Sequence, residues 1–271
     1  MKRTLSLILA LALSLTFALS LASCTAQKDD KTIKVGATST PHAEVLEIVK
    51  PLMEAKGYKL EIQVYSDYVL PNTATQDGDL DANYFQHTPY LDTFNKEQNT
   101  TLVAVAAVHY EPYGIYAGTA KALADLKDGD TIIVPNDATN EARALQLLAA
   151  QGLFTLKEGA GLTATAKDIT DNPHGYVIKE MEAALIPNYL DECAIAVING
   201  NYAIAAELDF TAALAVEDKN SEAAKTFANV LVVKEGNEQK EAVLALKECL
   251  LSQEVKTFIE NTYGGAVVPS F

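Results

Sequence analysis

Residues 79–91 read DLDANYFQHTPYL and join a strand-like run to the start of a helix. The run that ends at Phe85 follows the turn signal of Gly78, as strands commonly do. Pro89 suits the first turn of a helix, with Thr88 as its N-cap. Because α/β sheets place ligands where a strand end meets a helix start, we expect a binding site here.

Three side chains of this stretch carry rings, namely Phe85, His87 and Tyr90, and they cannot all face one core. In one interpretation they line the binding site. In the other, Phe85 and Tyr90 pack inward, as aromatic side chains mostly do, and His87 bonds only to the backbone. The stretch alone leaves both interpretations open.

The aspartates Asp77, Asp79 and Asp81 alternate as they do in a calcium-binding loop. Such a loop needs glycine at its sixth position and glutamate at its twelfth. Ala82 and Thr88 occupy those positions, so the sequence excludes a calcium loop of this type.

The chain starts with the pattern of a secretory signal. Lys2 and Arg3 precede an apolar run at 5–21, and LASC follows at 21–24. This end resembles a bacterial lipobox, which implies that Cys24 is lipid-modified and becomes the mature N-terminus. The alternative is an uncleaved membrane anchor, for which the run is at the low edge of the roughly 17–25 residues required.

The composition is strongly acidic, with 36 Asp and Glu against 21 Lys and Arg and a formal charge of −15. Such a charge argues against nucleic acid and anionic lipid as partners. We therefore expect membrane attachment through a lipid on Cys24 and not through a basic surface. Besides Cys24 the chain has only Cys193 and Cys249, for which we favour two buried thiols over a disulfide.

The chain lacks sequence motifs for catalysis or for a metal. It contains no Gly-x-Ser-x-Gly, no Walker loop and no Gly-x-Gly-x-x-Gly. The four histidines do not have the spacing of metal ligands, although folding could gather them; they are His42, His87, His109 and His174. We expect a protein that is not an enzyme and that holds no cofactor and no metal.

Expected strands alternate with expected helices, which predicts a parallel α/β fold. The alternation runs in two series, so we expect two lobes, with the strand at 229–233 returning the chain to the first. Residues 177–185 and 238–263 are expected to be helical. The predicted division is 1–23 for the signal peptide, 24–31 for a tether, 32–118 plus 222–271 for the first lobe and 119–221 for the second.

Residues 135–140, PNDATN, join a buried-type strand to a helix that has Arg143 in its first turn. Free N–H groups at a helix start attract anions, and a guanidinium can bind a carboxylate through two parallel hydrogen bonds. We therefore expect Arg143 to bind a ligand carboxylate. The alternative is that Arg143 pairs with Glu141 or another neighbour.

Two asparagines occupy strand ends. Asn199 follows a buried-type strand, and Asn229 opens the strand that returns to the first lobe. An amide oxygen can accept a hydrogen bond from an ammonium group. Each asparagine alone is more often a turn residue, so the sequence only nominates them.

Five motifs in one order resemble the NlpA/MetQ family of methionine-binding lipoproteins. The resemblance runs from about residue 33 to 271. The motifs are SDYVLPN at 66–72, DLDANYFQHTPYL at 79–91, PNDATN at 135–140, VIN at 197–199 and NV at 229–230.

The resemblance implies a two-lobed periplasmic-binding-protein fold of type II, with the ligand cleft between the lobes. It also implies delivery of the ligand to an ABC importer made of a permease and an ATPase. The ligand-binding residues that it implies are Tyr68, Phe85, His87, Tyr90, Asn140, Arg143, Asn199 and Asn229. The aromatic residues and His87 would hold a methionine side chain, Arg143 the carboxylate, and Asn199 and Asn229 the polar end of the ligand.

The sequence therefore predicts a lipid-anchored substrate-binding protein for L-methionine or a close relative, at the extracytoplasmic face of the cell membrane. One alternative is a zinc-type metal-binding lipoprotein of an importer. Others are a binder of a methionine-containing dipeptide, of a D-amino acid or of another apolar amino acid, and an exported hydrolase.

Overall fold

The structure is a computed structural model that describes residues 31–218 and 225–271. The expected signal peptide, Cys24 and most of the expected tether lie outside the described residues. No helix within the described ranges is long and apolar enough to cross a membrane.

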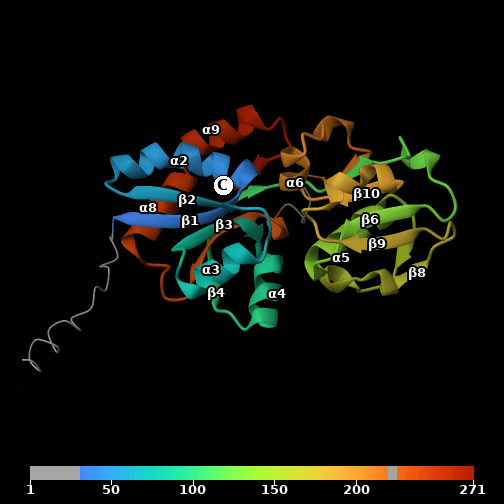
Figure 1. The fold of residues 1–271 in the computed structure, drawn as a ribbon, viewed down its shortest axis with the longest axis horizontal. Coiled ribbons are helices and arrows are strands. Elements are labelled where there is room, and N and C mark those ends of the chain that lie inside the picture. Colours follow the sequence, from blue (N-terminus) through green and yellow to red (C-terminus); the bar gives the residue numbers. More distant parts are fainter. Residues whose placement is uncertain (1–30, 219–224) are drawn as a thin grey trace, which may run out of the picture. The chain divides into compact units, whose positions relative to one another are not determined.

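Six strands form the first sheet, in the order β13-β4-β12-β3-β1-β2 (Figure 1). The first three strands of the chain run parallel, and β12 is inserted antiparallel between β3 and β4. The C-terminal part of the chain therefore completes the first sheet. The bounds are β1 (Thr32–Thr38), β2 (Lys59–Tyr65), β3 (Ala82–His87), β4 (Leu102–Tyr110), β12 (Asn229–Lys234) and β13 (Val268–Pro269).

Helices cover both faces of this sheet, with α2 and α9 on one side and α3 and α4 on the other (Figure 1). A large apolar core lies under α2, α8 and α9, and a smaller one lies under α4. The bounds are η1 (Ser39–Ala43), α2 (Glu44–Ala55), α3 (Leu70–Asp77), α4 (Thr88–Gln98), α8 (Glu241–Leu250) and α9 (Gln253–Thr262).

The helix α2 shows how the sequence builds this layer. Val45, Val49 and Met53 recur at helical spacing and are fully buried against the sheet. The helix continues through Pro51 and ends before Gly57, which has a φ of 81°. Glycine adopts this left-handed conformation without the steric cost that other residues bear, so it stops the helix here.

Five strands form the second sheet, in the order β11-β5-β10-β6-β9. Its cores contain α5 on one side and the short helix α6 on the other. The bounds are β5 (Gly114–Ala117), β6 (Thr131–Pro135), α5 (Ala138–Ala150), β9 (Val177–Met181), β10 (Ile195–Ile198), α6 (Gly200–Ala205) and β11 (Ala215–Val216). Smaller elements are η2 (Leu123–Asp125), β7 (Thr155–Leu156), η3 (Gly161–Thr163), η4 (Ala166–Asp168), β8 (Ile169–Asp171), η5 (Ile186–Glu192) and η6 (Phe210–Ala212).

The two sheets with their separate cores confirm the expected two-lobed α/β fold. We use "first lobe" and "second lobe" for the six-stranded and five-stranded sheets with their helices. The boundaries given by residue number stay a prediction. The strand β5 pairs with β10 in the second sheet, although residues 114–117 were expected in the first lobe.

Three local expectations were wrong. Residues 177–185 were expected to be helical, but 177–181 form β9, because parallel pairing with β6 outweighs their helix-forming composition. The expected helix at 238–263 is two helices, because Ser252 starts α9 as its N-cap. Thr88 is not the cap of α4, since His87 takes that position.

Cys193 and Cys249 are both buried and free, as favoured from the sequence. Cys193 precedes β10 of the second sheet, whereas Cys249 lies in α8 on the first. The two thiols therefore belong to different lobes.

Candidate functional site

One cavity lies where three strand ends meet three helix starts, at the β3–α4, β6–α5 and β10–α6 junctions. The space between its atoms, including the part that is open to solvent, is about 360 Å³. The lining residues are Tyr68, Phe85, Gln86, His87, Tyr90, Glu111, Asn140, Arg143, Asn199, Gly200, Asn201 and Asn229. The structure thus brings together all eight residues nominated from the sequence.

Aromatic rings form one wall of the cavity. The ring of Tyr68 lies 5.8 Å from those of Phe85 and Tyr90, measured between centroids. Tyr90 Oη donates to the backbone oxygen of Tyr68 at 3.1 Å, and Tyr68 Oη donates to Asn201 Oδ1 at 2.5 Å. Phe85 is almost fully buried and still lines the cavity, so the wall is packed and preformed.

His87 caps α4 and also contacts the second lobe. Its Nδ1 accepts from the backbone N–H of Tyr90 at 3.2 Å, so the neutral ring carries its proton on Nε2. That nitrogen lies 3.2 Å from Asn140 Oδ1. Burial, together with the charge of Arg143, lowers the pKa of His87 to about 4, so the ring is neutral at physiological pH.

Asn140 is fixed at the start of α5. Asp137 is the N-cap of this helix and accepts from the backbone N–H of Asn140 at 3.0 Å. The Asn140 amide nitrogen donates to the same carboxylate at 3.0 Å. Its oxygen therefore faces the other way, where His87 Nε2 and Asn199 Nδ2 both donate to it.

Arg143 is buried and pairs with a carboxylate of the protein itself. Its Nε donates to Glu217 Oε1 at 2.8 Å, and its Nη2 donates to Glu217 Oε2 and to the backbone oxygen of Glu111. Tyr110 Oη and the backbone N–H of Tyr113 also donate to Glu217. Burial opposes the charge of Arg143, but Glu217 outweighs it and raises the guanidinium pKa above its usual value.

This pairing changes the expected geometry at Arg143. The guanidinium edge that could bind a ligand through two parallel hydrogen bonds faces Glu217 instead. The alternative of an internal pair is realised with Glu217 and not with Glu141. Nη1 has no hydrogen-bond partner within residues 31–218 and 225–271, so its N–H groups remain for a ligand.

The amide groups of Asn199 and Asn229 are partly used inside the protein. Asn199 Oδ1 accepts from Tyr113 Oη at 3.3 Å. Asn229 Oδ1 lies 3.0 Å from His42 Nε2. Asn229 also offers its Nδ2, a donor, to a ligand, whereas the sequence analysis considered only the amide oxygen as an acceptor.

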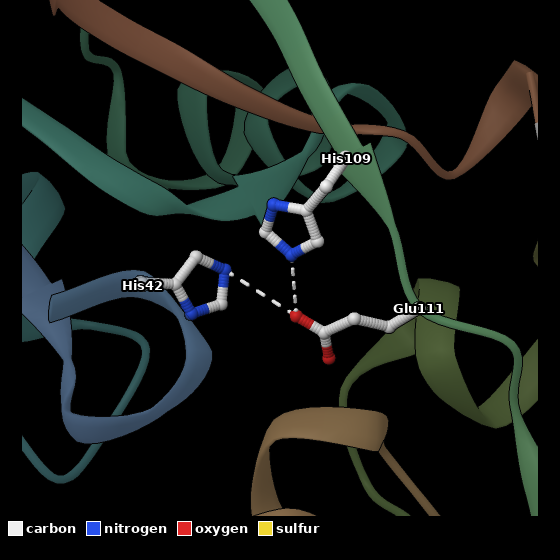
Figure 2. Close-up of side chains that lie close together, drawn as sticks. All are labelled: His42, His109 and Glu111. Carbon is white, nitrogen blue, oxygen red and sulfur yellow. Dashed lines mark hydrogen bonds and ion pairs between the residues drawn. The ribbon is translucent and has the colours of Figure 1, made fainter. Parts of the chain in front are cut away.

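His42, His109 and Glu111 form a buried cluster (Figure 2), and Glu111 also lines the cavity. Glu111 Oε1 lies 2.8 Å from His109 Nε2 and 3.5 Å from His42 Nε2. The other ring nitrogens bond to Tyr84 Oη and, at 2.7 Å, to Thr38 Oγ1. Burial lowers the pKa of His42 to about 4.

The cluster is the candidate metal site of the described residues, since its three donor atoms lie within 4.8 Å of one another. Tight zinc binding takes three or four such ligands. Each of these donors already has a hydrogen-bond partner in the protein. The arrangement is therefore complete as a hydrogen-bonded network without an ion.

Comparison with known proteins identifies the family. A family model described as NlpA lipoprotein matches residues 33–271. This protein belongs to the NlpA lipoprotein family. The match covers nearly all of the described chain, so the NlpA family fold includes both lobes and the cavity between them.

Relatives of this NlpA family protein include the methionine-binding lipoprotein MetQ of Bacillus subtilis, which is 42% identical over 95% of this chain and 96% of its own. A nutrient-binding protein from Burkholderia cenocepacia, solved bound to methionine, is 40% identical with a TM-score of 0.84, over 88% of this chain and 100% of its own. An ABC transporter periplasmic substrate-binding protein from Coxiella burnetii is 35% identical with a TM-score of 0.82, over 88% and 100%.

Sequence reasoning missed several residues of this NlpA family site. The sequence analysis singled out neither Glu111 nor Glu217. Glu217 meets Arg143 from 74 positions along the chain, a separation that no local pattern reveals. Glu111 could have been noticed because it lies between largely apolar and aromatic stretches of the sequence. A carboxylate that is buried in such surroundings needs charged or hydrogen-bonding partners.

Proposed function

We propose that this protein binds L-methionine, or a close relative of it, and delivers it to an ABC importer. The carrying observation is the cavity, in which an aromatic wall of the first lobe faces a guanidinium and amide groups of the second. The methionine named for the Bacillus relative and bound to the Burkholderia relative supports this ligand. The Coxiella relative supports the importer.

The chemistry of the cavity suits each part of methionine. A thioether gains roughly 0.3–1.5 kcal/mol per contact with an aromatic ring, and Tyr68, Phe85 and Tyr90 offer three rings. The ligand carboxylate would accept from Arg143 Nη1 and from Asn229 Nδ2. Because Glu217 holds the guanidinium in place, little conformational entropy is lost when the ligand binds.

We infer a binding role and not a catalytic one. Among the described residues that line the cavity there is no serine, threonine, cysteine or lysine, which are common nucleophiles of covalent catalysis. Turnover of any substrate by the purified protein would contradict this inference and favour the exported hydrolase.

We propose that Cys24 carries the lipid that holds the protein at the extracytoplasmic face of the cell membrane, where the permease and ATPase of the importer would receive the ligand. Cys24→Ala should leave the protein soluble or as an unprocessed precursor. A variant that stays in the membrane fraction with the mature N-terminus of the wild type would contradict the anchor.

The ligand can be identified directly. Protein purified from cells and then denatured should release methionine, detected by mass spectrometry, and the ligand-free protein should bind methionine in calorimetry. Release of a methionine-containing dipeptide would favour that alternative. The metal-binding alternative would be favoured if the purified protein held stoichiometric metal that a chelator removes, and if the His42→Ala variant bound less of that metal.

A further inference from the structure

Glu111 is the only carboxylate among the described residues that line the cavity. Its side chain is only 7% exposed, so it is an acid buried at the wall of the binding site. Burial alone would raise the pKa of this carboxyl. The hydrogen bond from His109 and the neighbouring imidazole rings outweigh burial, and the pKa lies below its usual value.

Both lobes hold the Glu111 carboxylate in place. Oε1 accepts from His109 Nε2 at 2.8 Å, and Oε2 accepts from the backbone N–H of Asn201 at 2.6 Å. A Cβ added to Gly200 would lie 2.7 Å from Glu111 Cβ, so only glycine allows this close approach. A carboxylate offers about four acceptor positions, so Glu111 can accept from further donors.

The amide oxygens in the cavity are weaker acceptors and are already in use. Each of them accepts at least one hydrogen bond from the protein. The pairs are Gln86 with Asn72, Asn140 with His87 and Asn199, Asn199 with Tyr113, Asn201 with Tyr68, and Asn229 with His42. A cationic group in the cavity would therefore be stabilised most by Glu111, because hydrogen bonds to an ionised acceptor are about twice as strong.

Glu111 also adjoins the group expected to bind the ligand carboxylate. Arg143 Nη2 donates to the Glu111 backbone oxygen at 2.9 Å. A free α-amino acid carries an ammonium group and a carboxylate group on the same carbon. Glu111 and Arg143 both line the cavity, so its wall offers groups of both charges to one ligand.

We propose that the Glu111 carboxylate receives the α-ammonium group of the ligand and so restricts the ligands to α-amino acids with a free amino group. This rests on the proposed function and sharpens it. A dipeptide with methionine at its second position has an uncharged amide nitrogen at that place, so it would lose this contact.

The test compares two ligands on two proteins by calorimetry. L-methionine and 4-(methylthio)butanoate differ only in the amino group. Glu111→Gln should weaken the binding of methionine by about 30-fold or more, because the substitution removes one partner of a buried charged pair. The same substitution should change binding of the amino-free analogue by less than about 3-fold. Glu248→Gln is the matched control, because Glu248 is exposed and its one ion pair among the described residues is with Lys56.

Unchanged methionine binding by Glu111→Gln would overturn the proposal. Equal weakening of both ligands would also overturn it, since Glu111 would then act only by holding the fold. Wild-type protein that binds neither ligand would instead contradict the proposed function. If circular dichroism shows that Glu111→Gln is unfolded, Glu111→Asp is measured in its place, and its loss should again be confined to methionine.

Discussion

At the scale of single residues, Arg143 is positioned before any ligand binds. Glu217 holds two of its nitrogens, and the rings of Tyr113 and Phe227 lie 4.5 and 4.3 Å from its guanidinium carbon. Burial of Glu217 raises the pKa of its carboxyl, but Arg143 outweighs this effect and the pKa is lowered, so the pair is ionised at physiological pH. The free part of the guanidinium is therefore held in one orientation.

Arg143→Lys should weaken methionine binding by about 10-fold or more, because one ammonium group cannot hold Glu217 and a ligand carboxylate in the geometry of a guanidinium. Calorimetry with both proteins measures the change. Methioninol, which lacks the carboxylate, is the control ligand and should lose little further affinity on substitution. Equal affinity of both proteins for methionine would contradict the assignment.

Glu217→Gln should lower the free energy of unfolding of the ligand-free protein by roughly 2 kcal/mol, because a buried guanidinium loses its charged partner. Urea denaturation measures this value. Glu248→Gln removes an exposed partner of Lys56 and should have almost no effect. If both substitutions had the same small effect, the Arg143–Glu217 pair would not contribute to the stability of the ligand-free protein.

At the scale of elements, side-chain caps decide where several helices begin. Asp137 caps α5, His87 caps α4 and Ser252 caps α9. The first two caps also place site residues, because each sits at the point where a strand delivers the chain to the cavity. The third lies outside the site and separates α8 from α9.

Ser252→Ala should lower the free energy of unfolding by about 0.5–1 kcal/mol, since the side chain accepts from the backbone N–H of Val255 at 3.4 Å. Thermal or urea unfolding measures the loss. Ser252→Asp, which keeps a capping oxygen, should restore most of it, and methionine affinity should not change in either variant. A stable Ser252→Ala protein would show that packing alone ends α8.

At the scale of the whole molecule, hydrogen bonds join the two lobes around the cavity. Tyr202 Oη donates to the backbone oxygen of Ser66 at 3.0 Å, and His87 contacts Asn140. A ligand that contacts both lobes binds the closed form of the protein more tightly than the open form. It therefore shifts the equilibrium towards the closed form, by an amount set by the difference between the two affinities. Ligand binding and lobe closure are thus expected to be coupled.

X-ray scattering should show a smaller radius of gyration for the methionine-saturated protein than for the ligand-free protein. Methionine should also stabilise the fold by about 2.7 kcal/mol at a hundredfold excess over the dissociation constant. Identical scattering profiles at verified saturation would refute closure without affecting the ligand assignment.

Stability should fall as the pH falls from about 6.5 towards 4, the window set by two buried histidines. Burial lowers the pKa of His42 and of His87 from 6.5 to about 4, so the unfolded chain binds more protons than the folded chain in this window. Each histidine contributes at most about 1.4 kcal/mol per pH unit. Urea unfolding across the window measures the slope, which His87→Gln should reduce. An undiminished slope in that variant would exclude His87 as a contributor.

The sequence by itself determined the α/β class, the two lobes and the eight nominated residues that the structure gathers around one cavity. The set of eight residues was implied by the resemblance to the NlpA/MetQ family, whereas the α/β class and the two lobes follow from short-range patterns. Apolar periodicity sets which face of α2 is buried, and polar loops after buried strands place His87, Asn140 and Asn199 at strand ends.

The tertiary structure alone decided which side chains pair. In the folded protein Glu217 pairs with Arg143, and Glu111 bonds to both His109 and the start of α6. Residues 177–181 form a strand beside β6. Such contacts join positions far apart in the chain, and the energy of a buried charge depends on every group around it. A local pattern contains the residue types but not their neighbours in space, so these partners become visible only when the packed core fixes them.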